Sequence, residues 1–128
     1  MKTSILLCIL FISVSALFSN KFVAQEDVKN RAVLVINAMV NQEHKHELQG
    51  YLSQMMPIFK DNGGKPLGRY KTIEKIQGSL APEMIAIVSF ENTETIKKML
   101  ESDRYKSLSD LRELVFSDLK IVLCTELN

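Results

Sequence analysis

Apolar residues recur with a short period in four segments of the chain after residue 30. Residues 31–39 (RAVLVINAM) and 83–91 (EMIAIVSFE) are short and rich in branched apolar residues, which predicts buried strands. Residues 118–127 have the same character. Residues 65–78 alternate loosely and contain Pro66 near their start, which predicts a partly exposed strand. These four segments predict the strands of one sheet.

The segments between these strands have a helical period of apolar residues. After Asn41, a candidate N-cap, apolar residues are spaced three and four apart, with Pro57 interrupting the stripe. The stripe consists of Leu48, Tyr51, Leu52, Met55, Met56 and Phe59. Asn92 predicts the start of a second helix, and a break near Ser102 and Asp103 leads into a further helical stretch.

The order of elements is therefore βαββαβ. This order predicts an α+β, ferredoxin-like domain with an antiparallel four-stranded sheet over residues 29–128. Gly63 and Gly64 lie between the first helix and the second strand. A phosphate-binding loop needs the opposite order, in which glycines follow a strand and precede a helix. We therefore expect no nucleotide and no other cofactor.

Both faces of the predicted strands are apolar. In the first strand, Leu34 and Ile36 point to one face, while Val33 and Val35 point to the other, and the third and fourth strands repeat this pattern. Helices cover one face of such a sheet, and an apolar second face left bare would be an association site. The simplest cover is a second copy, so we expect a two-fold homodimer, a dimeric α+β barrel.

The N-terminus predicts export. One lysine, Lys2, precedes an apolar run over residues 5–18, which is too short for a spanning helix and fits a signal peptide. We assign residues 1–24 to this signal, with cleavage after Ala16 or Ala24; an uncleaved anchor is the alternative. The mature protein would then be periplasmic or secreted, with no stable membrane association.

Charge excludes some classes of partner. The 128 residues carry 16 Lys and Arg against 15 Asp and Glu, a net charge of +1. This balance argues against binding to nucleic acid or acidic membranes.

Cysteine and histidine suggest no metal or redox centre. Without the signal, Cys124 is the only cysteine, so no intrachain disulfide can form, and its apolar surroundings predict a small buried residue. His44 and His46 are two residues apart, about 200° around a helix, which disfavours a shared metal ion.

Three stretches resemble a known family. They are YLSQMMPIFKDNGGKPLGRY, SLAPEMIAIVSFENTETIKKML and ESDRYKSLSDLREL. Over residues 33–127 the chain resembles the domain-of-unknown-function 1330 (DUF1330) family of dimeric α+β-barrel proteins. The resemblance departs at Tyr70 and Lys71, where that family commonly has two glycines.

The resemblance implies a candidate cleft formed by Arg69, Tyr105 and Arg112. In a functional interpretation, an arginine binds an anionic group and the tyrosine donates a hydrogen bond within a cleft between sheet and helices. In a structural interpretation, the tyrosine packs at the core rim and the arginines pair with acids. Three functions stay open: binding of a small organic molecule, a cofactor-independent monooxygenase or isomerase, and a purely structural or interaction module.

Overall fold

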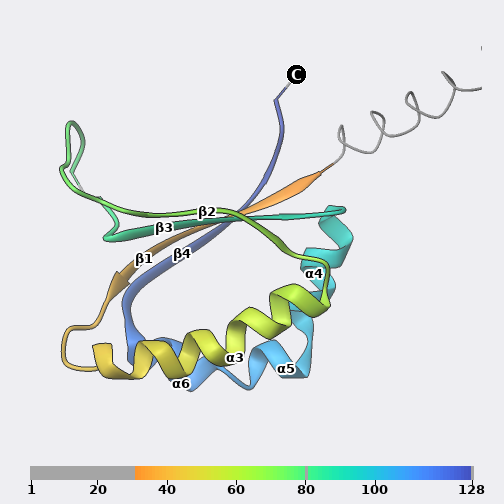
Figure 1. The fold of residues 1–128 in the computed structure, drawn as a ribbon, viewed down its shortest axis with the longest axis horizontal. Coiled ribbons are helices and arrows are strands. Elements are labelled where there is room, and N and C mark those ends of the chain that lie inside the picture. The colour runs from red at the N-terminus through yellow and green to blue at the C-terminus, as the bar shows by residue number, and fades with distance from the viewer. Residues whose placement is uncertain (1–30, 80, 128) are drawn as a thin grey trace, which may run out of the picture. The chain divides into compact units, whose positions relative to one another are not determined.

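The computed structural model describes residues 31–79 and 81–127. Four strands form one antiparallel sheet in the order β2-β3-β1-β4 (Figure 1). Their bounds are Ala32–Val40 for β1, Lys65–Lys71 for β2, Met84–Phe90 for β3 and Phe116–Thr125 for β4. The predicted signal peptide and the first residues of the predicted domain lie outside the described residues. Within the described part, no helix has the length and apolar character that a membrane crossing requires.

The helices cover one face of this sheet (Figure 1). They are the 3₁₀ turn η2 (Lys45–Glu47) and the α-helices α3 (Leu48–Asp61), α4 (Thr93–Glu101), α5 (Asp103–Lys106) and α6 (Ser109–Val115). The predicted ferredoxin-like α+β fold is therefore confirmed.

The strand registers decide which residues face the helices. On β1, Leu34 pairs with Val88 of β3 and Ile36 pairs with Ala86, so these residues lie on one face. Leu34 and Ile36 also pair with Leu123 and Ile121 of β4. We call this the covered face. The buried core lies between it and the helices: Ala32, Leu34, Ala38, Tyr51, Met55, Ile58, Phe59, Val88, Phe90, Ile96, Met99, Leu108, Val115 and Phe116.

Two boundaries differ from the sequence predictions. The first helix starts at Leu48, because the Asn41 side chain accepts a hydrogen bond from the Glu43 amide 3.1 Å away and closes a local turn before η2. That helix continues through Pro57 as far as Asp61. Strand β2 ends at Lys71, so the strand predicted for residues 65–78 was too long by seven residues.

The glycine pair ends α3, as predicted. Gly63 has a φ of 77°, in the left-handed region that glycine adopts without steric cost. Gly64 is needed for a different reason, since a Cβ there would lie 2.9 Å from the Phe90 ring and 2.8 Å from the Phe59 carbonyl oxygen. This close approach lets β2 leave the helix directly toward the sheet.

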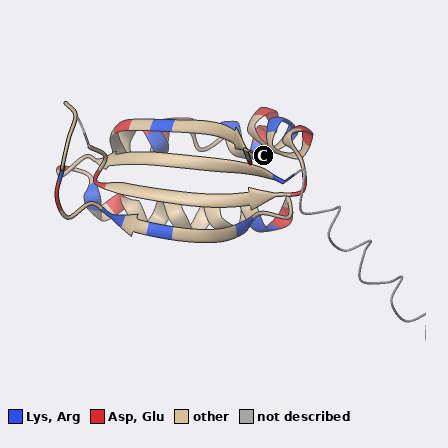
Figure 2. Ribbon diagram, turned by 90° about the horizontal axis from the view of Figure 1, so that it is seen from above, with Lys and Arg blue, Asp and Glu red and all other residues tan. Residues whose placement is uncertain are grey.

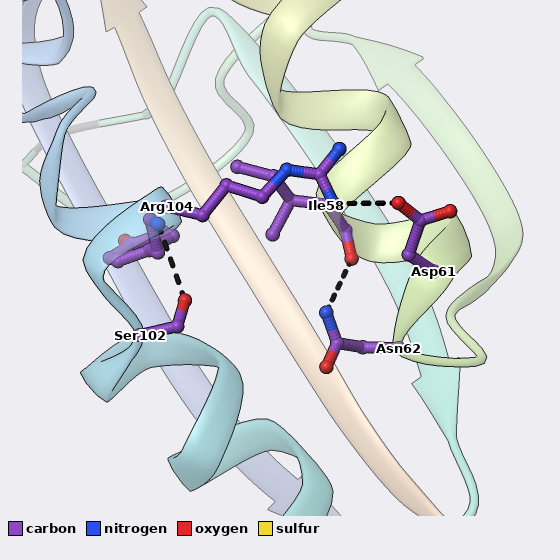
Figure 3. Close-up of polar contacts among 6 residues, drawn as sticks. Ile58, Asp61, Asn62, Ser102 and Arg104 are labelled. Atoms are coloured by element: carbon purple, nitrogen blue, oxygen red, sulfur yellow. Dashed lines mark hydrogen bonds and ion pairs between the residues drawn. The ribbon is translucent and has the colours of Figure 1, made fainter.

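Polar contacts fix the ends of the helices. The Asn92 side chain accepts from the Thr95 amide at 2.9 Å, so Asn92 is the N-cap of α4 as predicted. Ser102 separates α4 from α5 (Figure 3). Its hydroxyl oxygen accepts a hydrogen bond from the Tyr105 amide at 3.3 Å. Arg104 of α5 pairs with Asp61 at the end of α3, with 2.6 Å between Nη1 and Oδ2 (Figure 3).

The opposite face of the sheet, which we call the bare face, has no element of the described chain packed over it (Figure 1). Val35 pairs there with Ile87 and with Val122, and Val122 is 48% exposed. Charged residues lie on the edge strands and not on the two central strands (Figure 2). Cys124, predicted to be buried, is only half-buried because it pairs with Val33 on this face.

Candidate functional site

A cavity of about 310 Å³ lies between the covered face and the helices. Strands β1, β3 and β4 form its floor, helix α3 forms one wall, and residues of α4, α5 and β2 complete it. The lining is almost entirely apolar: Leu34, Ile36, Ala38, Leu52, Met55, Met56, Phe59, Pro66, Gly68, Met84, Ala86, Ile87, Val88, Leu100, Phe116, Leu119 and Ile121. The three other lining residues are Tyr51, Arg69 and Tyr105.

The register of β2 aims Arg69 at this cavity. Arg69 pairs with Ala86 of β3, and Ala86 pairs with Ile36 of β1, so all three lie in one row across the covered face. Among the described residues that line the cavity, Arg69 is the only charged one. Its guanidinium forms no ion pair and no hydrogen bond with other described residues. The arginine is therefore free to pair with an anion.

Arg112 lies behind the two tyrosines. Its Nε–H donates to the Tyr51 hydroxyl oxygen at 3.3 Å, and Nη2 donates to the Tyr105 carbonyl oxygen at 3.0 Å. The guanidinium carbon also lies 4.0 Å from the centre of the Tyr105 ring, a cation–π distance. One guanidinium thus fixes the position of both phenols.

Both tyrosines line the cavity, and each phenol has a proton left to donate. Because the Tyr51 oxygen accepts from Arg112, its own proton stays available for another acceptor. The Tyr105 hydroxyl makes no hydrogen bond with other groups in the described ranges. Burial raises the pKa of Tyr105 above 10.0, more than the Arg112 charge lowers it. Tyr105 is therefore a neutral donor throughout the physiological pH range.

A second hollow adjoins the cavity at Arg69 and Met84, which line both. It is an open groove between the start of α3 and β2, and its lining includes Lys45, His46 and Lys71. Glu83 is its one carboxylate, and Oε2 of Glu83 accepts a hydrogen bond from the Val40 amide at 3.2 Å.

The structure brings Arg69 and Tyr105 to one cavity, and Arg112 contacts Tyr105 without lining the cavity itself. Arg112 bonds to Tyr51 and to Tyr105, not to the acids that a structural interpretation would suggest. Tyr51 was missed as a polar residue, because in sequence it is one position of an apolar helical stripe. The only signal in the sequence was a tyrosine on the apolar face of a helix, because a buried hydroxyl needs a hydrogen-bond partner. In the structure Tyr51 is 5% exposed.

Metal ligands do not gather in the described ranges 31–79 and 81–127. No three His, Cys, Asp or Glu side chains there lie close enough to hold a metal ion. His46 instead lies 3.5 Å from the carboxylate of Glu47.

Solved structures share this fold at low sequence identity. A protein of unknown function from Rhodopseudomonas palustris is 12% identical, with a TM-score of 0.67 over 78% of this chain and 85% of that one. A candidate antibiotic biosynthesis monooxygenase from Bacteroides thetaiotaomicron is 16% identical, with a TM-score of 0.55 over 79% and 93%. A NIPSNAP-like domain protein from Burkholderia xenovorans is 8% identical, with a TM-score of 0.53 over 77% and 87%.

These likenesses establish the fold alone. None of the curated protein sequences matches the chain at a significant level. The sequence model of a domain of unknown function, DUF1330, matches residues 32–125, nearly all of the described domain. The resemblance found in the sequence is thereby confirmed, and the chain belongs to the DUF1330 family.

Proposed function

We propose that the protein binds a small organic molecule in the cavity on the covered face. The observation that carries this proposal is an apolar space of about 310 Å³ next to free polar groups. Ligand pockets in proteins commonly measure about 300–1,000 Å³ and combine apolar walls with a few polar groups. A purely structural module would fill such a space with side chains, as protein cores do.

The test is to fill the cavity from its floor. Ala86 lines the cavity, so Ala86→Phe adds a ring where the ligand would lie. Gln54→Phe adds the same ring on the exposed side of α3 as a matched control. We expect anilinonaphthalene sulfonate to bind the wild type and Gln54→Phe with enhanced fluorescence, and decanol to displace it. Loss of binding in Ala86→Phe supports the proposal, and equal binding in all three proteins contradicts it.

The same proposal includes a homodimer formed through the bare face. Its apolar residues continue the pattern of the core, yet Val122 and Tyr70 are about half exposed. The connection after β2 bends away from the helices, toward the side of the bare face (Figure 1). It carries Ile73 and Ile76, which are 99% and 87% exposed. A second copy would cover both features, and light scattering after size exclusion should give twice the chain mass.

Export is the remaining part of the proposal. It rests on the apolar N-terminal segment behind Lys2. Mass spectrometry of the extracytoplasmic protein should find an N-terminus after Ala16 or Ala24. A protein that keeps Met1 and sediments with membranes would support the uncleaved anchor.

An enzymatic role is the second candidate. Neutral phenols beside an arginine could hold and polarise an organic substrate without a cofactor. One protein of similar fold is described as a candidate monooxygenase. If the protein turns over such a substrate, Arg69→Ala should abolish turnover without unfolding. Normal turnover in this variant would exclude the proposed role of Arg69.

A further inference from the structure

The cavity and the groove together form one amphipathic space. The cavity is apolar and enclosed by helix and sheet, whereas the groove is open to solvent and carries charged side chains. Arg69 and Met84 belong to the lining of both, so a molecule in the cavity can extend into the groove past these residues. A ligand that fits has an apolar part and a polar end.

The charge at the junction is positive. Lys45, Arg69 and Lys71 line the groove, and none of them forms an ion pair with another described residue. Arg69 and Lys71 lie on the same face of β2, because their partners Ala86 and Met84 are both on the covered face. The polar end of the ligand is therefore expected to be an anion.

One carboxylate lies among the groove cations and lowers their net charge. Glu83 lines the groove, and its hydrogen bond to the Val40 amide holds it there. The three exposed cations exceed this carboxylate by two charges, so the groove keeps a net positive charge and attracts an anion. A planar carboxylate also matches the fork of the Arg69 guanidinium.

We infer that the ligand is a carboxylic acid with an apolar chain, held with its chain in the cavity and its carboxylate at Arg69. This inference rests on the proposed function, since it names the class of molecule for that cavity. Lys71 and Lys45 strengthen the field at the mouth without touching the chain.

Decanoate and decanol are the probes, because they share a chain and differ in charge. Calorimetric titration of the wild type should give a dissociation constant about tenfold lower for decanoate than for decanol. Arg69→Gln should weaken decanoate binding about tenfold and decanol binding much less, because decanol carries no charge to pair with the guanidinium. Lys98→Gln removes an exposed charge from α4 and serves as the matched control. Added salt should weaken decanoate binding alone, because the groove cations are exposed.

Four outcomes would overturn the inference, and they separate its failure from that of the proposed function. Equal affinity for decanoate and decanol, or an equal loss of affinity for both in Arg69→Gln, would mean that the cavity binds apolar molecules and does not discriminate by charge. Tighter binding of decyl phosphate than of decanoate would replace the carboxylate with a doubly charged group. If wild-type protein binds neither decanol nor decanoate, the proposed function fails as well.

Discussion

The two central strands present mostly apolar side chains to both faces of the sheet, but the two faces have very different surroundings. On β1, Leu34 points to the covered face and is 1% exposed, while its neighbour Val35 points to the bare face and is half-buried. The covered face meets helices of its own chain and still leaves a cavity, whereas the bare face meets nothing in the described chain (Figure 1). The covered face therefore encloses a cavity, whereas the bare face leaves apolar side chains such as Val122 exposed.

The first prediction compares how much stability the protein loses when a side chain is truncated on each face. Leu34→Ala removes a fully buried side chain from the covered face and should lower the free energy of unfolding by about 2–5 kcal/mol. Val35→Ala, one residue away, should cost about 1 kcal/mol or less in dilute protein. Urea unfolding followed by circular dichroism measures both. Equal losses in the two variants would mean that the faces do not differ in packing.

The next prediction concerns assembly through the bare face. Val122→Glu places a carboxylate on that face, and a two-fold interface would bring a carboxylate from each copy to it. The dimer dissociation constant should rise at least about tenfold, with unchanged circular dichroism. Gln54→Glu adds the same charge on α3 and should leave the mass at that of a dimer. A Val122→Glu protein that stays dimeric at low concentration would place the interface elsewhere.

A smaller difference in stability is expected between substitutions of two arginines in the helical layer. Arg112→Gln removes the contacts to Tyr51 and Tyr105 and should cost about 1 kcal/mol of stability. Arg104→Gln breaks an exposed pair with Asp61 and should cost about 0.5 kcal/mol or less.

The affinity for decanol should distinguish these two arginines further. Only Arg112→Gln should weaken decanol binding, because only this residue positions groups that line the cavity. Equal effects of Arg112→Gln and Arg104→Gln on affinity would remove the supporting role assigned to Arg112.

The smallest expected effect is on pH dependence. Burial raises the pKa of Tyr105 above its ordinary value of 10.0, so the folded protein favours the neutral phenol. Its contribution to stability is complete below pH 10.0 and is lost as pH rises from there through the higher folded-state pKa. Tyr105→Phe should flatten this alkaline decline without changing the profile at neutral pH. An unchanged alkaline profile in Tyr105→Phe would assign the decline to another group.

The sequence predicted the fold well because the fold depends on local and periodic signals. Strand alternation, the Asn92 cap and the glycines at 63 and 64 all act within a few residues. The end of β2 could not be predicted this way, since residues 72–78 alternate like a strand. Beyond the pairing of Lys71 with Met84, Thr72 still bonds to the neighbouring segment through the Glu83 carbonyl oxygen, and the ladder then ends.

The site was only partly predictable for a related reason. Only the family resemblance placed Arg69 and Tyr105 in one cleft, because their positions along the chain and the apolar periodicity gave no sign that they lie close together. Tyr51 and Arg112 are 61 residues apart, and only the packing of α3 against α6 brings them together. The groove around Lys45 and Lys71 also depends on where η2 lies relative to β2.

The most direct test of the ligand cavity is methyl-resolved NMR during a titration with decanol. The methyl signals of Ala86, Met55 and Met84, which line the cavity, should shift with a common saturation curve. The signals of Val33 and Val122 on the bare face should stay in place. Shifts confined to Val33 and Val122 would mean that the molecule binds the bare face, and the assignment of the ligand site to the covered face would be wrong.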